Sequence, residues 1–270
     1  MGFDGRPTAL VLGGCQHGLD DLGVGLLRRS SARLRDAFGE LPAPAFAPEG
    51  PHFLYDQGPQ LFSQRTGRGP LRVMLDTNIF VDFVERAQTI WVEDIEVGDK
   101  HGEELEALQL IMAAWVIRDI RLFLPDALRW DGGHRLSMSR RRQRAHAIRE
   151  FDMALQLVGE FDEDPQPGPI DVRTMNSLLE RVPKGGDRSI AREAATAGMH
   201  VLLTRDERFL KARPNMRLLG VLLVSPQELF ESLVMAGAFH CLLFPQCAYW
   251  PLPDQHRTSH LARLATLASS

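Results

Sequence analysis

Between residues 72 and 236, short apolar runs alternate with longer segments of helical periodicity, and this alternation limits the fold more than any other feature of the sequence. Such alternation predicts an α/β fold, in which helices flank a parallel sheet. The predicted strands are 72–76, 120–125, 200–204 and 217–224. The predicted helices are 79–88, 102–118, 134–160, 171–181, 187–197, 206–212 and 226–236.

The residues before this alternation have a different character. An apolar run at 8–12 predicts a strand, Gly13-Gly14 predicts a tight turn, and leucines at near-helical spacing predict a helix over 19–38. Residues 41–51 are too rich in proline for a helix or a central strand, and predict a linker or a surface strap. We therefore expect three parts, which are an N-terminal extension (1–70), an α/β domain (71–236) and a C-terminal tail (237–270).

Bulk composition sets limits on partners and compartment. The net charge of −4 does not indicate a nucleic-acid partner, so any such binding must come from local patches. The three cysteines form no disulfide framework, which is typical of a reducing compartment. Because there is no apolar run of about 18 residues and no signal peptide pattern at the start, we expect a cytoplasmic protein without a membrane partner.

Three aspartates follow predicted strands or begin a predicted helix. Asp76 ends the first apolar strand, Asp206 follows the strand at 200–204, and Asp187 opens a helix after two glycines. In a parallel α/β sheet these positions gather along one edge, where like charges repel unless a cation lies between them. Oxygen ligands without Cys or His suit Mg²⁺ or Mn²⁺. The sequence thus predicts an acidic metal site, whose carboxylates are held by hydrogen bonds from Thr77, Asn78 and Thr204.

Each acid also has a simpler interpretation. An Asp before a helix is commonly an N-cap, worth about 1 kcal/mol, and this is the favoured interpretation for Asp187 taken alone. An Asp after a strand, such as Asp206, is commonly part of a turn. Asp82 is expected to be a solvated or capping residue. The joint occurrence of the three acids, and the buried position of Asp76, favour the metal site.

Two segments of the chain resemble motifs of the PIN-domain nucleases. Residues 76–82 (Asp-Thr-Asn-Ile-Phe-Val-Asp) resemble the opening motif of that family, and residues 187–191 with 203–209 resemble its closing pair of acids. The resemblance covers about residues 71–232. The family carries one more acid, usually Glu, after the second strand. Asp131 falls at that place here, and Asp126 is its competitor.

The resemblance implies a PIN-like, three-layer αβα fold with a central parallel sheet, and a metal-dependent endoribonuclease. It implies that one or two Mg²⁺ or Mn²⁺ ions, held by Asp76, Asp131, Asp187 and Asp206, support hydrolysis of phosphodiester bonds in RNA. Small members of the family are commonly the toxin half of a toxin–antitoxin pair, so a cognate antitoxin, another protein partner or a homo-oligomer is compatible with it.

Two alternatives to the nuclease remain. A non-catalytic PIN scaffold that binds protein or RNA agrees with the replacement of the usual Glu by Asp131 and with the long extensions. A haloacid-dehalogenase-type phosphotransferase would need a second Asp two residues after Asp76, where Asn78 stands. Metal-dependent cleavage that is lost on chelation separates the enzyme from the scaffold.

Arginines cluster between Arg135 and Arg149, in the helix predicted to follow Asp131. Arg140 and Arg144 share one helical face. Most such runs are solvated surface, but this one starts beside the proposed acidic site, so we predict that Arg140 and Arg144 bind RNA phosphates.

The tail holds Cys241, Cys247, His256 and His260, which are spaced like a compressed Cys₂His₂ zinc set. The spacing between the cysteines is wider than in the usual zinc knuckle, and apolar residues surround them. We therefore favour an apolar strap that packs on the domain over a zinc site.

Overall fold

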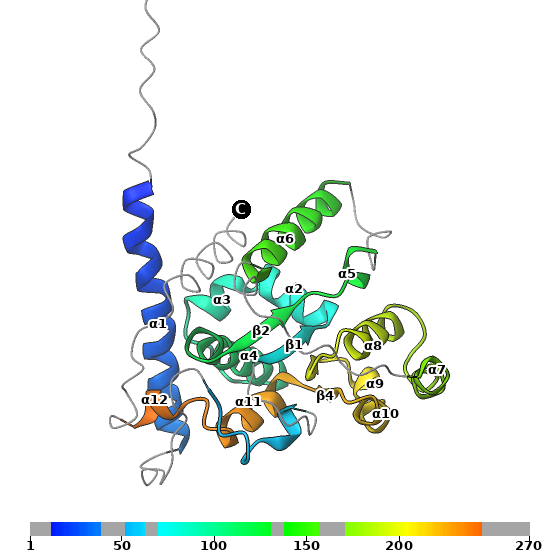
Figure 1. The fold of residues 1–270 in the computed structure, drawn as a ribbon. Coiled ribbons are helices and arrows are strands. Elements are labelled where there is room, and N and C mark those ends of the chain that lie inside the picture. The colour runs from blue at the N-terminus through cyan, green and yellow to red at the C-terminus, as the bar shows by residue number, and fades with distance from the viewer. Residues whose placement is uncertain (1–11, 39–51, 63–69, 131–137, 157–170, 245–270) are drawn as a thin grey trace, which may run out of the picture.

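A parallel sheet lies at the centre of the computed structural model, which describes residues 12–38, 52–62, 70–130, 138–156 and 171–244 (Figure 1). Its strands are β1 (Leu71–Leu75), β2 (Ile120–Phe123), β3 (Val201–Leu203) and β4 (Leu222–Val224), in the order β2-β1-β3-β4. All three neighbouring pairs are parallel. The predicted α/β class with a parallel sheet flanked by helices is therefore confirmed.

Apart from Arg72 in β1 and Arg121 in β2, the strands are apolar, because both faces of the sheet are covered. Along β1, Val73 and Leu75 point into one hydrophobic cluster while Met74 points into another. In β3, Val201 and Leu203 belong to the first cluster and Leu202 to the second. This alternation follows from the two-residue period of a strand. It divides the core into two layers, one on each face of the sheet.

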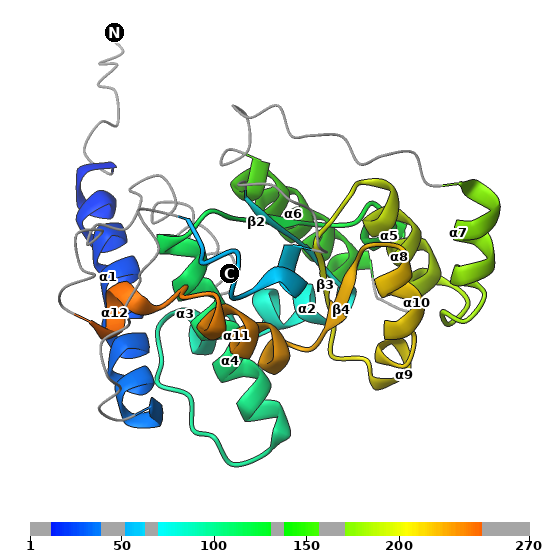
Figure 2. The ribbon, with the colours of Figure 1, turned by 60° about the horizontal axis from the view of Figure 1, so that its bottom comes forward.

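Helices from different parts of the chain cover the two faces, and both views show them on opposite sides of the sheet (Figures 1 and 2). The first face carries α2 (Thr77–Glu85), α3 (Ala87–Trp91), α4 (Lys100–Ile117), α6 (Met138–Gln156) and α11 (Pro226–Met235). The second face carries α7 (Val172–Leu179), α8 (Gly186–Thr196), α9 (Glu207–Leu210) and α10 (Arg213–Leu218). The short helix α5 (Ala127–Trp130) follows β2.

The described part of the N-terminal extension packs on the first of these layers. Helix α1 (Leu12–Phe38) contributes Leu26 and Leu34 to the same cluster as α4, and a short 3-10 helix (Pro59–Phe62) adds to it. The Ser31 hydroxyl donates to the Leu242 carbonyl of α12 (His240–Leu243) at 2.9 Å. Extension, domain and the start of the tail thus share one hydrophobic core.

Several boundaries differ from the sequence prediction. Gly13 and Gly14 lie within α1, so the tight turn is wrong; a helical glycine costs about 1 kcal/mol relative to alanine, which does not end a long helix. The predicted strand 217–224 is a strand only over β4, because Gly220 (φ +76°) ends the preceding helix. Residues 8–11 and 41–51 lie outside the described part.

Helix α6 covers 138–156 of the predicted helix 134–160, and the rest of that prediction also falls outside the described residues. The predicted helix 79–88 is two helices, α2 and α3, with a break at Arg86. No helix in the described ranges combines the length and the apolar character that crossing a membrane requires.

Candidate functional site

The candidate site lies between the carboxyl ends of β1 and β3. The chain passes from β1 to β2 on one side of β1, and β3 then takes the place on the other side. This makes the β1–β3 boundary a topological switch point, the position at which open α/β sheets bind ligands. Asp76 directly follows β1, and Thr204, Arg205 and Asp206 directly follow β3. Two of the predicted acids therefore lie at the switch point.

Asp76 is buried, with 3% of its surface exposed, and both of its carboxylate oxygens accept hydrogen bonds. Oδ1 accepts from the N–H of Thr77 at 2.6 Å, as the N-cap of α2. Oδ2 accepts from Asn78 Nδ2 at 2.7 Å and from the Thr204 hydroxyl at 2.5 Å. Burial raises the pKa of Asp76, these hydrogen bonds oppose the rise, and the charge of Asp206 adds to it. The pKa remains above its ordinary value.

Thr204 joins Asp76 to Asp206. Its hydroxyl donates to Asp76 and accepts from the N–H of Asp206 at 3.1 Å. Asn78 adds a second connection, because its Nδ2 binds Asp76 and its Oδ1 accepts from the N–H of Arg205 at 3.1 Å. The Thr77 hydroxyl, in contrast, is buried and has no hydrogen-bond partner within the described ranges, so Thr77 acts on Asp76 through its backbone alone.

Asp206 is half-buried and caps α9. Its Oδ1 accepts from the N–H groups of Arg208 at 2.7 Å and Phe209 at 3.4 Å. Both cap bonds use the same oxygen. The other oxygen, Oδ2, makes neither of them, and the charge of Asp206 is close enough to Asp76 to raise its pKa.

The other two predicted acids, Asp187 and Asp131, are not shown beside Asp76 and Asp206. Asp187 lies half-buried in the first turn of α8, and in the described part of the chain no three His, Cys, Asp or Glu side chains form a group that could hold a metal ion. Asp131 lies outside the described residues. Its competitor Asp126 is exposed, and its N–H donates to Glu193 Oε1 at 2.8 Å. Residues 127–130, between Asp126 and Asp131, are helical.

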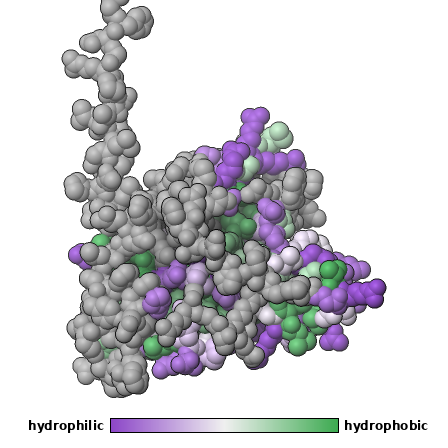
Figure 3. Space-filling model, in the orientation of Figure 1, coloured by the Kyte–Doolittle hydropathy of each residue, from purple (hydrophilic) through white to green (hydrophobic). Residues whose placement is uncertain are grey.

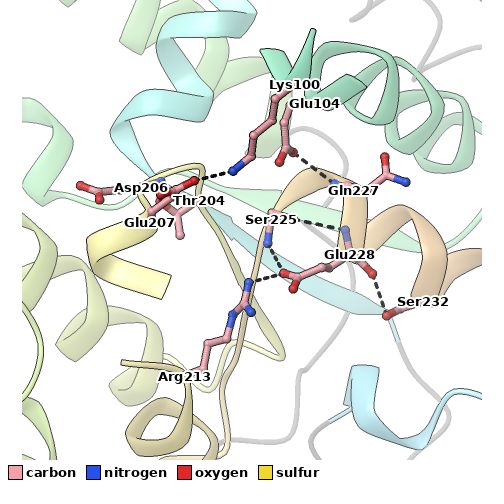
Figure 4. Close-up of polar contacts among 10 residues, drawn as sticks. All are labelled: Lys100, Glu104, Thr204, Asp206, Glu207, Arg213, Ser225, Gln227, Glu228 and Ser232. Atoms are coloured by element: carbon pink, nitrogen blue, oxygen red, sulfur yellow. Dashed lines mark hydrogen bonds and ion pairs between the residues drawn. The ribbon is translucent and has the colours of Figure 1, made fainter. Parts of the chain in front are cut away.

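Other acids at this edge of the sheet are engaged in structural contacts (Figure 4). Ser225, which follows β4, forms a capping box with Glu228, and Arg213 pairs with the same carboxylate. Glu104 accepts from the N–H of Gln227 at 3.2 Å, at the start of α11. The contacts of these carboxylates explain their presence without any ligand.

The pair Asp76 and Asp206 fits a hard divalent cation. Mg²⁺ is usually bound by one or two carboxylates, while waters and substrate phosphates fill its other positions. A carboxylate has about four lone-pair sites, and Asp76 uses three of them for its donors. Within the contacts of the described residues, one site on Asp76 and the uncapped oxygen of Asp206 are then left for a cation.

Sequence reasoning missed a second charged pair beside the site. Asp82 on α2 is 3% exposed, so the prediction of a solvated or capping residue is wrong. Arg205 Nη2 donates to its Oδ1 at 2.8 Å and lies 2.7 Å from its Oδ2. Burial raises the pKa of Asp82 to about 6 against the attraction of Arg205 and Arg86. Asp82 is buried because it shares the inner face of α2 with Ile79 and Phe83; only its spacing from Ile79 signalled this.

A histidine completes this contact. His101, near the start of α4, lies with its Nδ1 at 2.6 Å from Arg205 Nη1. Burial lowers the pKa of His101, and the charges of Arg205 and Arg86 lower it further. The neutral imidazole can therefore accept a hydrogen bond from Arg205 at Nδ1.

The arginine run lies on α6, where hydrophilic side chains gather at the N-terminal end of the helix (Figure 3). Arg141 and Arg142 are exposed. Arg144 is half-buried, and its Nη2 lies 3.5 Å from the Leu128 carbonyl of α5. The side chain of Arg140 falls outside the described part, so the predicted phosphate contacts stay a prediction.

In the tail, Cys241 is half-buried, and Arg118 Nη2 lies 3.8 Å from its sulfur. Cys247, His256 and His260 lie outside the described residues, so the zinc alternative is not decided. Leu242 and Leu243 pack against the core, as expected for the start of an apolar strap.

Comparisons with models of known protein families, with curated proteins and with solved structures found no match for this chain. The case for its function therefore depends on its own residues and their geometry.

Proposed function

We propose that the chain is a PIN-like endoribonuclease that depends on Mg²⁺ or Mn²⁺ and hydrolyses phosphodiester bonds in RNA. The observation that carries this proposal is a buried carboxylate, Asp76, at the switch point of a parallel sheet and linked through Thr204 to a second carboxylate, Asp206. Asp76 and Asp206 would hold the cation, and Asp131 and Asp187 are the further acids of the proposed set. The bound ion would supply a water of lowered pKa and stabilise charge on the phosphoryl group.

The residues around Asp76 prepare it for this role. Three donors fix the orientation of its carboxylate, and burial, together with the charge of Asp206, raises its pKa. A cation placed between Asp76 and Asp206 would offset both the burial of one carboxylate and the repulsion between the two.

The test compares Asp76→Asn and Asp206→Asn with the wild-type protein in cleavage of a labelled single-stranded RNA with Mn²⁺. Residues that only orient metal ligands typically change activity 10- to 100-fold, so loss of a ligand should cost at least about 100-fold. Asp171→Asn is the matched control, because Asp171 is also an N-cap aspartate but is exposed at the start of α7. Full activity in either site variant, or wild-type cleavage that survives chelation, contradicts the proposal.

RNA is proposed to pass along α6, where Arg140 and Arg144 would contact phosphates. Replacing both with Ala should weaken RNA binding and flatten the slope of log affinity against log salt by about 0.7 per lost contact on a single strand. Arg149→Ala, an exposed substitution farther along α6, is the control. An equal slope in the double variant and the wild type would move the RNA path elsewhere.

The second candidate is a non-catalytic scaffold of the same fold. It is favoured by Asp131, which stands where the PIN-domain nucleases usually carry Glu, and by the long extensions at both ends. A scaffold would bind RNA or a protein partner, such as a cognate antitoxin, with the same affinity in the Asp76→Asn variant. It would also give no Mn²⁺-dependent cleavage.

A further inference from the structure

Two of the proposed metal ligands, Asp76 and Asp206, belong to two segments that a second contact also joins. Asp76 caps α2, and Asp82 lies less than two turns further along the same helix. Asp206 follows Arg205 in the loop between β3 and α9. The Asp82–Arg205 ion pair therefore connects the helix that carries one carboxylate with the loop that carries the other.

This loop is held largely by side chains. β3 ends at Leu203, and the N–H of Thr204 still donates to the Val224 carbonyl of β4. The next two N–H groups donate to side-chain oxygens, that of Arg205 to Asn78 and that of Asp206 to Thr204. The direction in which Asp206 points therefore depends on side-chain contacts more than on the sheet ladder.

The ion pair is a strong constraint on that loop. Asp82 is 3% exposed, and both of its oxygens lie within 2.8 Å of the same nitrogen of Arg205. His101 lies on α4, a third element, and its Nδ1 contacts the other terminal nitrogen of Arg205, Nη1. Moving the loop would leave a buried carboxylate without its partner, which is strongly unfavourable. The pair therefore resists displacement of Arg205 and of the residue after it.

We propose that Asp82 and Arg205 are positioning residues, which hold the Asp206 loop against the helix that carries Asp76 and so set the separation of the two carboxylates. The expected effect of this pair on cation binding rests on the proposed function. The ordering of the loop itself does not depend on it.

The first test is amide hydrogen exchange, measured by NMR on the metal-free full chain. In Asp82→Asn, exchange of the Asp206 amide should accelerate by about ten-fold or more, the equivalent of losing about one charged hydrogen bond. The Leu202 amide in the adjacent strand should not accelerate to the same extent. A general loss of stability would instead accelerate both amides together, and that result, or unchanged exchange at Asp206, would overturn the proposal.

The second test is the affinity for Mn²⁺ alone, measured by calorimetry on the same variants. Asp82→Asn and Arg205→Gln should each weaken binding by about ten-fold, and the double variant should be no weaker than either single variant, because both changes break one interaction. Lys100→Gln is the control, because Lys100 forms an exposed ion pair with Glu207 beside the same loop. Wild-type affinity in both single variants would overturn the positioning role.

The two proposals can fail separately. If the wild-type chain binds no Mn²⁺, the proposed function fails, and the exchange of the Asp206 amide still decides whether Asp82 orders the loop. If Asp82→Asn does not fold, Asp82→Glu keeps the charge but shifts it by one methylene. Its Asp206 amide should then exchange faster than that of the wild type, and equal exchange would overturn the proposal.

Discussion

Replacing Thr204 with valine should destabilise the metal-free protein, because the Thr204 hydroxyl serves both carboxylates. It donates to Asp76 at 2.5 Å and accepts from the N–H of Asp206 at 3.1 Å, at a position with no exposed surface. Valine has nearly the same shape, so the substitution removes the hydrogen bonds and leaves the packing in place.

The expected cost follows from these two contacts. A hydrogen bond to a charged group contributes about 1.5–3 kcal/mol, and a neutral one about 0.5–1.5 kcal/mol. Asn78 Nδ2 retains its bond to Asp76, so its loss of Thr204 as a second acceptor matters little. The free energy of unfolding of Thr204→Val should therefore fall by about 2–4 kcal/mol at neutral pH.

Urea unfolding in the presence of a chelator measures this change. Thr204→Ser keeps the hydroxyl and loses one methyl group, which should cost only about 1 kcal/mol. Thr77→Val is the second control, because the buried Thr77 hydroxyl has no hydrogen-bond partner among the described residues and its removal should be nearly neutral. If Thr204→Val is as stable as Thr77→Val, the hydroxyl does not hold Asp76.

The dependence of this cost on pH has a defined sign. The hydroxyl favours the ionised form of Asp76 and so restrains the rise in its pKa that burial causes. Without it, the folded-state pKa of Asp76 should rise further, and more stability is then lost as the pH increases through that pKa. The difference between wild type and Thr204→Val should therefore be largest at neutral pH and shrink as the pH falls and Asp76 becomes protonated.

Three further changes test other parts of the structure. Arg118→Leu should lower the free energy of unfolding by about 2–5 kcal/mol in urea, because this fully buried guanidinium donates to the carbonyls of 237–238. Arg205→Gln should raise the pKa of Asp82 above about 6, as read by NMR titration, because Arg205 is the main charge that opposes burial. Asp99→Ala should cost about 1 kcal/mol of thermal stability, because Asp99 Oδ1 caps α4 through the N–H of Gly102.

Much of the fold could be predicted from local pattern. The apolar runs around Val73 and Leu202 are continuous because both faces of a parallel sheet are buried, and that signal lies within a few residues of sequence. The same logic placed Asp76 and Asp206 at one edge, since parallel strands present their carboxyl ends together. Boundaries such as the start of β4 were less predictable, because they depend on one glycine conformation.

The contacts that depend on distant residues could not be predicted in this way. Asp82 looked like a surface acid because its partner, Arg205, lies 123 positions away in the sequence. The packing of α1 on α4 likewise depends on which hydrophobic surface of the domain is left exposed by the other helices. Residues 12–38 alone do not indicate which surface that is. Asp187 was grouped with the other acids on the basis of strand and helix order, but that order did not determine how far its side chain lies from theirs.

Capping alone does not explain the acids at the switch point. Asp76 caps α2 and Asp206 caps α9, and the positive end of each helix helps to stabilise the charge. At the end of β4, however, Ser225 caps α11 with a neutral hydroxyl (Figure 4). A helix at this edge can therefore begin without an acidic cap residue. The carboxylates occur at the two strand ends that flank the switch point, where their mutual repulsion is an added cost. A bound cation would remove that cost, which is why the coupling between Asp76 and Asp206 supports a metal site better than the presence of either acid.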